Sequence, residues 1–218
     1  MTLSKQTSFL EQDLPSTEPL GPGAVILRQF ATPVDAALLA NIQEVAAQAA
    51  FRHMVTPGGF RMSVAMTNCG PLGWVTDHSG YRYQSTDPAG GSPWPPMPAA
   101  LHDLATRAAA EAGFREFEPD ACLINRYEPG ARLTLHQDKD EEDYSQPIVS
   151  VSLGLPAVFQ FGGLTRSERP KRYALRHGDI VVWGGASRLR YHGVLALKEG
   201  EHPLTGRCRI NLTFRKAA

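Results

Sequence analysis

From residue 120 to the C-terminus, the chain is a series of short runs in which apolar and polar residues alternate, separated by glycine, proline or aspartate. An alternation with a period of two is the pattern of strands that rest one face on a core. Many short strands with turn residues between them are typical of a β-sandwich or a jelly roll. We therefore expect residues 120–218 to form an all-β core. The clearest runs are ACLINRYEP, PIVSVSLGLP, AVFQFGG and CRINLTFR.

Two earlier segments predict helices, over residues 32–51 and 97–114. Apolar residues recur in the first segment at helical spacing, which indicates one buried face. Thr32 can cap that helix, and Pro33 suits its first position. Gly113 is a stop signal for the second helix. The expected architecture is α+β but mainly β, with helices preceding the β core.

Three further segments complete this organisation. Residues 24–30 have the composition of a first strand, and residues 1–22 have the polar and Pro/Gly content of a flexible tail. Residues 53–97 are rich in glycine, proline and aromatic residues, with few clean periods. Long irregular segments in compact domains are often binding loops or lids, so we expect this role here.

The last run, RINLTFR, raises a question about its polar face. Side chains alternate along a strand, so four polar residues share one face and three apolar residues share the other. The polar face is either a solvated surface or the lining of an anionic site. Its members are Arg209, Asn211, Thr213 and Arg215.

A second group of residues predicts a metal site. His136 and Asp138 lie two positions apart and share one face of a predicted strand. His192 supplies a third ligand from a separate run. Two histidines and a carboxylate form the facial triad of non-haem Fe(II) oxygenases, which leaves positions open for a cosubstrate and O2. A chance HxD pair with an unrelated downstream histidine is the alternative.

The two arginines of the last run favour the oxygenase interpretation. An arginine fork suits a carboxylate, so a polar face with Arg209 and Arg215 can hold the dicarboxylate 2-oxoglutarate. The run LINRY places Asn125 and Tyr127 on one face, where both could donate to the same ligand. A sheet with one solvated face would explain the same pattern.

Composition limits the other possibilities. The 22 Lys and Arg residues balance the 22 Asp and Glu residues, so nucleic-acid contacts would come from local patches rather than from bulk charge. The cysteines Cys69, Cys122 and Cys208 are far apart and form no CxxC pair, which argues against a disulfide framework or a cysteine zinc site. No run is long enough to span a membrane and no signal peptide is evident, so we expect a cytoplasmic protein, and a monomer.

These motifs resemble the AlkB family of Fe(II)- and 2-oxoglutarate-dependent nucleic-acid dealkylases. The resemblance is carried by PDACLINRYEPGARLTLHQDKDE, PIVSVSLGLPAVFQFGG, HGDIVVWGG and CRINLTFR, and it runs from about residue 22 to the C-terminus. It implies a single catalytic domain over 23–218, with a double-stranded β-helix over 120–218 and a nucleotide-recognition lid over 53–97.

The resemblance also implies ligand sites. Fe(II) would be bound by His136, Asp138 and His192. The distal carboxylate of 2-oxoglutarate would be bound by Tyr127, Arg209 and Asn211, while Asn125 and Arg215 would lie near the iron-bound end.

Substrate contacts follow in the same way. By resemblance, Trp74 stacks on a flipped-out base, Tyr81 and residues 56–59 contact the nucleic-acid backbone, Asp140 contacts the exocyclic amine of the base, and Arg166 lies near the base or backbone. Each has a simpler alternative. Trp74 could be a core residue, the acidic run after Lys139 could be solvated, and the basic residues around Arg166 could be ordinary surface.

The implied reaction is oxidative demethylation of 1-methyladenine and 3-methylcytosine in DNA, with RNA as a second candidate. It consumes 2-oxoglutarate and O2 and releases formaldehyde, succinate and CO2. Reaching the base requires flipping or a single strand. Two alternatives remain: an oxygenase of the same fold that hydroxylates a small molecule or a protein side chain, and a non-catalytic binding module.

Overall fold

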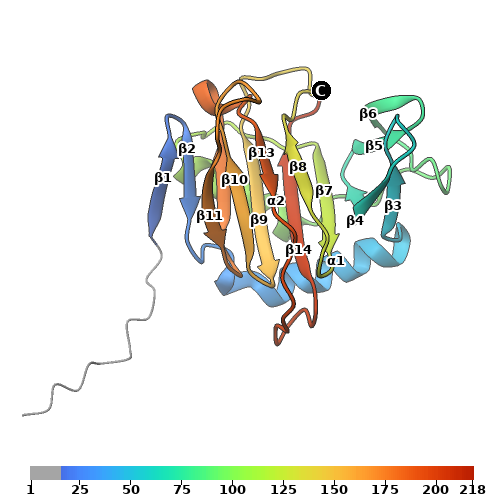
Figure 1. Ribbon diagram of the computed structural model, residues 1–218. Coiled ribbons are helices and arrows are strands. Elements are labelled where there is room, and N and C mark those ends of the chain that lie inside the picture. Colours follow the sequence, from blue (N-terminus) through green and yellow to red (C-terminus); the bar gives the residue numbers. More distant parts are fainter. Residues whose placement is uncertain (1–15) are drawn as a thin grey trace, which may run out of the picture.

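The computed structural model describes residues 16–218 and contains two larger antiparallel sheets and a separate hairpin (Figure 1). The major sheet has eight strands in the order β1-β2-β12-β9-β14-β7-β4-β3. Its strands are β1 (Thr17–Gly21), β2 (Ala24–Leu27), β3 (Arg52–Val55), β4 (Arg61–Cys69), β7 (Ala121–Tyr127), β9 (Ile148–Gly154), β12 (Ile180–Trp183) and β14 (Arg209–Arg215).

The minor sheet has four strands in the order β11-β10-β13-β8. These are β8 (Leu133–His136), β10 (Ala157–Phe161), β11 (Lys171–Leu175) and β13 (His192–Val194). The hairpin consists of β5 (Gly73–Asp77) and β6 (Gly80–Gln84). Strands after residue 120 contribute to both sheets, so the predicted jelly-roll core is confirmed.

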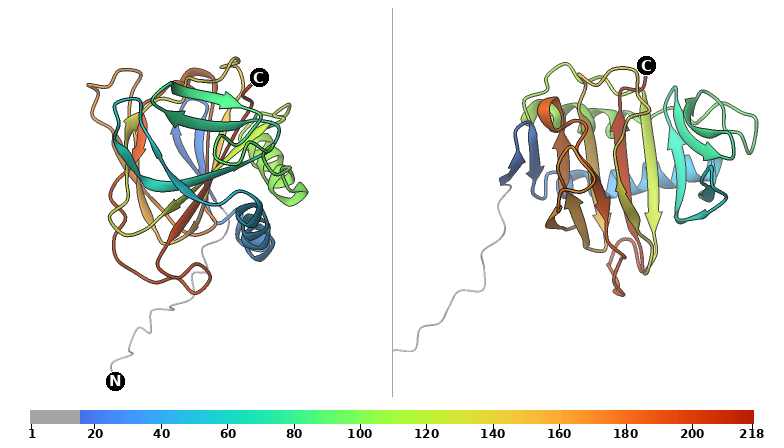
Figure 2. Two further views of the ribbon diagram at one scale, coloured as in Figure 1. Left: turned by 90° about the vertical axis from the view of Figure 1, so that its right-hand side faces the viewer. Right: turned by 45° about the horizontal axis from the view of Figure 1, so that its top comes forward.

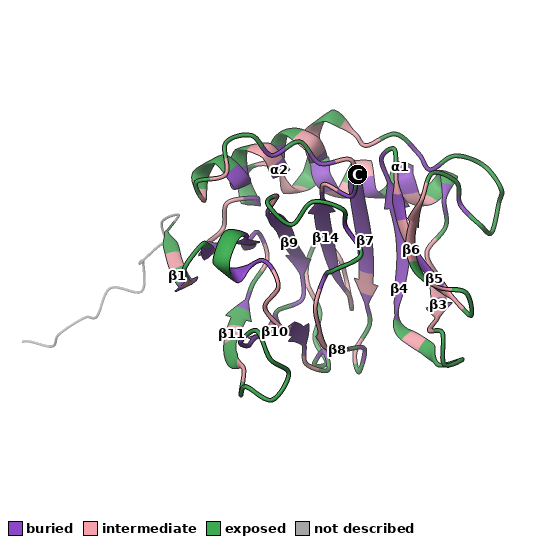
Figure 3. Cartoon of the chain, turned by 90° about the horizontal axis from the view of Figure 1, so that it is seen from above, coloured by how far each residue is buried: buried purple, intermediate pink, exposed green. Residues whose placement is uncertain are grey.

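The alternation in β14 separates two apolar cores. Ile210, Leu212 and Phe214 pack in the cluster that contains the helices. Residues of the opposite face of the sheet, such as Tyr127 and Trp183, pack instead with the minor sheet. Every residue of β14 is buried, so its polar face lines the space between the sheets (Figure 3). The solvated-surface alternative for that face is therefore wrong.

Two helices, α1 (Asp35–Gln48) and α2 (Ala99–Glu111), lie on the same side of the strands (Figure 2). The buried stripe of α1 contains Leu38, Ile42 and Val45. The first turn of the helix predicted over 32–51 is a separate short 3-10 helix, η1 (Thr32–Val34). No side chain caps η1 or α1, so the capping role predicted for Thr32 is wrong. Gly113 follows α2 with φ of +93°, a conformation that glycine adopts at little cost. A second 3-10 turn, η2, spans Gly185–Ser187.

The predicted boundaries near the N-terminus need correction. Residues 1–15 of the predicted tail lie outside the described residues, whereas Thr17–Gly21 form β1 and pair with β2, so the tail prediction is wrong for these five residues. The Pro/Gly content there marks the β1–β2 turn, where Gly23 has φ of +68°. The strand predicted over 24–30 ends at Leu27, because Gln29 turns into the left-handed region with φ of +54°.

The segment 53–97 contains most of β3 and all of β4, β5 and β6, which corrects the prediction of a segment without regular structure. β4 pairs with β7 inside the major sheet, and its second half is buried. The remaining strands, β5 and β6, form the hairpin beside the sheets. β4, which was included in the predicted lid, is therefore a strand of the major sheet. Only the β5–β6 hairpin forms a sheet of its own.

The three cysteines are free thiols. Among residues 16–218, no helix has the length and apolar character needed to cross a membrane.

Candidate active site

A cavity of about 400 Å³ lies between the two sheets and is also lined by the β5–β6 hairpin. The structure brings the predicted metal, 2-oxoglutarate and base-contact residues to this one cavity, and of the predicted backbone contacts 56–59 it brings Thr56. Their individual roles stay predictions. The residues that line it include His136, Asp138, His192, Asn125, Tyr127, Arg209, Asn211, Arg215, Trp74, Tyr81, Asp140 and Arg166.

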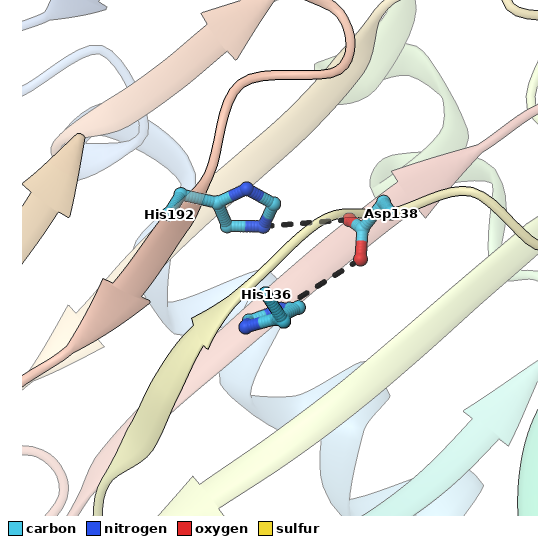
Figure 4. Close-up of side chains that lie close together, drawn as sticks. All are labelled: His136, Asp138 and His192. Carbon is cyan, nitrogen blue, oxygen red and sulfur yellow. Dashed lines mark ion pairs between the residues drawn. The ribbon is translucent and has the colours of Figure 1, made fainter. Parts of the chain in front are cut away.

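Three of these residues form the candidate metal site (Figure 4). His136 ends β8 and His192 begins β13, and the register of the minor sheet pairs these two residues. Nε2 of His136 lies 3.7 Å from Oδ1 of Asp138, and Nε2 of His192 lies 3.7 Å from Oδ2. Because bonds from transition metals to nitrogen and oxygen are about 2 Å long, one ion can bridge donor atoms at this spacing.

The protonation of both imidazoles suits metal binding. Nδ1 of His136 lies 2.8 Å from the carbonyl oxygen of Thr134, and Nδ1 of His192 lies 3.0 Å from that of Arg190. A carbonyl only accepts, so each Nδ1 carries the proton and each Nε2 presents its lone pair. Burial and the neighbouring His136 lower the pKa of His192 to about 4, which keeps this ring neutral at physiological pH.

Asp138 is held by an arginine from β14. Nη2 and Nε of Arg215 both donate to Oδ2, at 2.7 and 3.1 Å. Burial alone would raise the pKa of Asp138, but the charge of Arg215 outweighs it and lowers that pKa, with help from the two histidines where they are protonated. The carboxylate is therefore ionised, with Oδ1 left free of the arginine.

Arg209, the second arginine of β14, forms no ion pair with an acidic residue within 16–218. Arg209 is 1% exposed, stacks over the Tyr127 ring at 4.9 Å and donates from Nη2 to Oγ of Ser152 at 2.9 Å. Its Nε and Nη1 have no hydrogen-bond partner among the described residues. Burial lowers its pKa, opposed by Tyr127. A buried guanidinium with unused donors requires a compensating anion, and a carboxylate matches its geometry.

Amides and hydroxyls surround this guanidinium. Asn211 donates to Oγ of Ser150 and to the carbonyl of Val151, at 2.8 and 2.9 Å. Asn125 lies across the β14–β7 ladder and donates weakly to Oδ1 of Asn211 at 3.4 Å, while its own Oδ1 has no partner among the described residues. The cavity therefore has unused polar capacity on its β7–β14 wall.

These features fit an iron site with 2-oxoglutarate. Two imidazoles and one carboxylate are the ligands of Fe(II) in facial-triad oxygenases. The unpartnered donors of Arg209 fit the far carboxylate of a dicarboxylate that reaches from the metal.

The hairpin places aromatic residues at the mouth of the cavity. The rings of Trp74 and Tyr81 stack with centroids 5.7 Å apart and planes inclined by 19°. Nε1 of Trp74 donates to Oδ2 of Asp140 at 2.8 Å, and the half-buried side chain lines the cavity while it packs against the core. The guanidinium of Arg166 lies 5.9 Å from the Tyr191 ring, and both residues line the cavity.

The loop before β4 also reaches the mouth. Thr56 lines the cavity, whereas Phe60 leaves it and is 75% exposed.

Sequence reasoning missed one buried group next to the site. Asp140, Glu142 and Asp143 are exposed, as a solvated acidic run would be, but Glu141 is 5% exposed. It contacts Tyr83, Arg188 and Arg215. No signal in the sequence separated Glu141 from its acidic neighbours, because its partners come from distant strands and loops.

The comparisons with known proteins agree with this geometry. The model of the 2OG-Fe(II) oxygenase superfamily matches residues 23–215. The chain is 63% identical over 203 residues to the alpha-ketoglutarate-dependent dioxygenase AlkB of Escherichia coli (strain K12), covering 93% of this chain and 94% of that protein. It is 37% identical over 134 residues to the nucleic acid dioxygenase ALKBH1 of Homo sapiens, covering 60% of this chain and 34% of that protein.

Among solved structures, that of OsALKBH1 matches with a TM-score of 0.81 and 29% identity, covering 92% of this chain and 100% of that chain. Fold, site geometry and sequence thus agree, and the chain belongs to the AlkB family of the 2OG-Fe(II) oxygenase superfamily.

Proposed function

We propose that this oxygenase removes N-methyl groups from 1-methyladenine and 3-methylcytosine in DNA, and also in RNA. The observation that carries the proposal is the position of the Trp74–Tyr81 stack and Asp140 at the mouth of the cavity that holds the His136–Asp138–His192 cluster. Such a mouth presents a flat aromatic face and a negative charge to a base that enters the cavity. The name of the human relative, nucleic acid dioxygenase ALKBH1, supports the same substrate class.

Residues of this chain would hold the reactants in a fixed relation. His136, Asp138 and His192 would bind Fe(II), and Arg209 would bind the far carboxylate of 2-oxoglutarate. When bound, Fe(II), 2-oxoglutarate and O2 supply an oxidation that yields succinate and CO2 and converts the N-methyl group into a hydroxymethyl group. The hydroxymethyl base then releases formaldehyde and restores the unmodified base.

The hairpin would select the lesion. An indole stacks on any base, and its face also attracts a cation. A methylated adenine or cytosine carries a positive charge, so the carboxylate of Asp140 would favour the lesion over the neutral normal base. The hydrogen bond from Trp74 to Asp140 fixes both groups relative to each other. A methylated base that cannot pair also costs less to unstack.

Product analysis with the full chain tests the proposal. The protein, with Fe(II), 2-oxoglutarate and O2, is mixed with an oligonucleotide that carries one 1-methyladenine, with its unmethylated twin, and with a methylated peptide. We expect formaldehyde from the methylated oligonucleotide alone, in DNA and in RNA. Turnover with the peptide, or none with the oligonucleotide despite intact metal binding, would favour an oxygenase with a different substrate.

A further inference from the structure

Glu141 connects the metal site to the hairpin. Its Oε1 accepts from the Tyr83 hydroxyl at 2.6 Å and lies 3.3 Å from Nε of Arg215, and its Oε2 accepts from Nη2 of Arg188 at 2.9 Å. With both guanidiniums buried, one carboxylate fixes two cations from different parts of the chain.

Both cations continue to the metal ligand Asp138. Arg215 donates to its carboxylate, with Nη2 2.7 Å from Oδ2. Arg188 donates from Nη1 to its main-chain carbonyl at 2.8 Å. Glu141 thus positions the side chain of Asp138 through Arg215 and the backbone of Asp138 through Arg188.

The other end of this network is the hairpin. Tyr83 on β6 lies opposite Trp74 on β5 in the hairpin register. Two consecutive acids of one loop therefore hold a cross-strand pair: Asp140 accepts from Trp74, and Glu141 accepts from Tyr83. Burial raises the pKa of Tyr83 well above its ordinary range, opposed by Arg215, so its hydroxyl stays a donor.

A two-stranded hairpin is marginally stable alone, so β5–β6 depends on such contacts to keep its place. In the major sheet, Asn68 holds the backbone of Trp74 through two hydrogen bonds of 3.0 Å. The Tyr83–Glu141 bond is different, because it leads to the metal ligand.

We infer that Glu141 is a positioning residue that couples docking of the β5–β6 hairpin, through Tyr83, to the orientation of Asp138. The inference rests on the proposed function, because the ligand that binds to the hairpin is the methylated nucleic acid. Nucleic acid that settles on Trp74 and Tyr81 holds the hairpin in place, and the network then holds Asp138 in one orientation.

The test uses the full chain loaded with Co(II) and 2-oxoglutarate without O2. The visible ligand-field spectrum of Co(II) reports the geometry of its ligands, and fluorescence anisotropy reports binding of a 1-methyladenine oligonucleotide separately. The variants are Tyr83→Phe, which removes one hydroxyl, and Glu141→Gln, which keeps an acceptor for Tyr83 but loses the charge. The matched control is Tyr144→Phe, since the Tyr144 hydroxyl donates to the carbonyl of Lys139 in the same loop, and phenylalanine keeps the ring that lies 5.5 Å from the Arg188 guanidinium.

We expect a saturating oligonucleotide to change the Co(II) spectrum of the wild type and of Tyr144→Phe. Tyr83→Phe should bind the oligonucleotide within about threefold of the wild type, yet lose at least half of the spectral change, and Glu141→Gln should lose it as well. A merely structural role would lower thermal stability without altering this response.

A full spectral response in Tyr83→Phe would overturn the inference, and so would a full response in Glu141→Gln. The same holds if the wild type binds the oligonucleotide without a spectral change, or if Tyr83→Phe does not bind it, because Tyr83 would then act in binding. Failure of the proposed function is a distinct result, in which the wild type neither binds the oligonucleotide nor releases formaldehyde from it.

Discussion

Arg215 places both of its hydrogen bonds to Asp138 on a single carboxylate oxygen, Oδ2, and leaves Oδ1 at 3.7 Å from Nε2 of His136. The arginine thereby fixes the rotation of the carboxylate and keeps it charged. One side chain of the last strand thus determines how the predicted metal ligand Asp138, in a distant loop, is oriented.

Removing this arginine should destabilise the protein strongly. Arg215→Ala leaves Asp138 and Glu141 buried without their shared cation, which for a buried pair costs about 3–5 kcal/mol. Urea unfolding of the metal-free protein measures this loss. Arg207→Ala is the control, because Arg207 forms an exposed pair with Glu199, and such pairs contribute about 1 kcal/mol or less. Equal losses in the two variants would contradict the role given to Arg215.

Arg209→Ala should weaken binding of 2-oxoglutarate while leaving metal binding nearly intact. The variant loses a charge-assisted hydrogen bond but no metal ligand, and such bonds contribute about 1.5–3 kcal/mol, or about 10- to 150-fold in affinity. Calorimetric titration without O2 measures the affinity of the metal-free protein for the metal and that of the metal-loaded protein for 2-oxoglutarate. Arg207→Ala again serves as the control. Unchanged affinity for 2-oxoglutarate in Arg209→Ala would refute the proposed pairing of Arg209 with the far carboxylate of 2-oxoglutarate.

Trp74→Ala should weaken binding of the methylated oligonucleotide and spare 2-oxoglutarate. Stacking of one base on an aromatic ring contributes about 1–3 kcal/mol, so we expect a rise of about 5- to 150-fold in the oligonucleotide KM. Trp74→Phe keeps a ring but loses the hydrogen bond to Asp140, and it should lie between the wild type and the alanine variant. If Trp74→Ala binds the oligonucleotide normally, the hairpin does not hold the base.

The metal-free protein should lose stability as the pH falls from about 6.5 to 4. Burial lowers the pKa of His192 to about 4 in the folded state, whereas an unfolded histidine has a pKa near 6.5. The unfolded state therefore binds the proton first, and His192 contributes up to about 3 kcal/mol that is present above pH 6.5 and lost toward pH 4. Urea unfolding with a chelator at several pH values measures this slope. His192→Gln should flatten it, and stability that rises on acidification would have the wrong sign.

The sequence predicted side-chain positions best where residues alternate between the two faces of a strand. The parity of RINLTFR predicted which residues of β14 share a face, and the buried polar face of that strand agrees. The structure brings His136, Asp138 and His192 together, but the predicted strand face shared by His136 and Asp138 is wrong, because β8 ends at His136 and Asp138 lies in the loop that follows. Strand geometry alone therefore converts spacing into position in β14 but not at Asp138.

The sequence was less informative where tertiary contacts decide. The burial of Glu141 depends on Tyr83, Arg188 and Arg215, which come from three distant parts of the chain. β4 was not predicted, since every residue of its second half is buried and the residues there show no simple alternation. The turn at Gly23 resembled a loose tail because the signals for turns and for flexible segments share proline and glycine.

The most direct test of the account is the stoichiometry of products from one methylated oligonucleotide. The protein is supplied with Fe(II), 2-oxoglutarate and O2, and succinate and formaldehyde are both quantified after complete repair of a 1-methyladenine oligonucleotide. The account predicts about one succinate for each formaldehyde, and loss of both products in His136→Ala. Formaldehyde release that needs no 2-oxoglutarate, or that persists in His136→Ala, would contradict it.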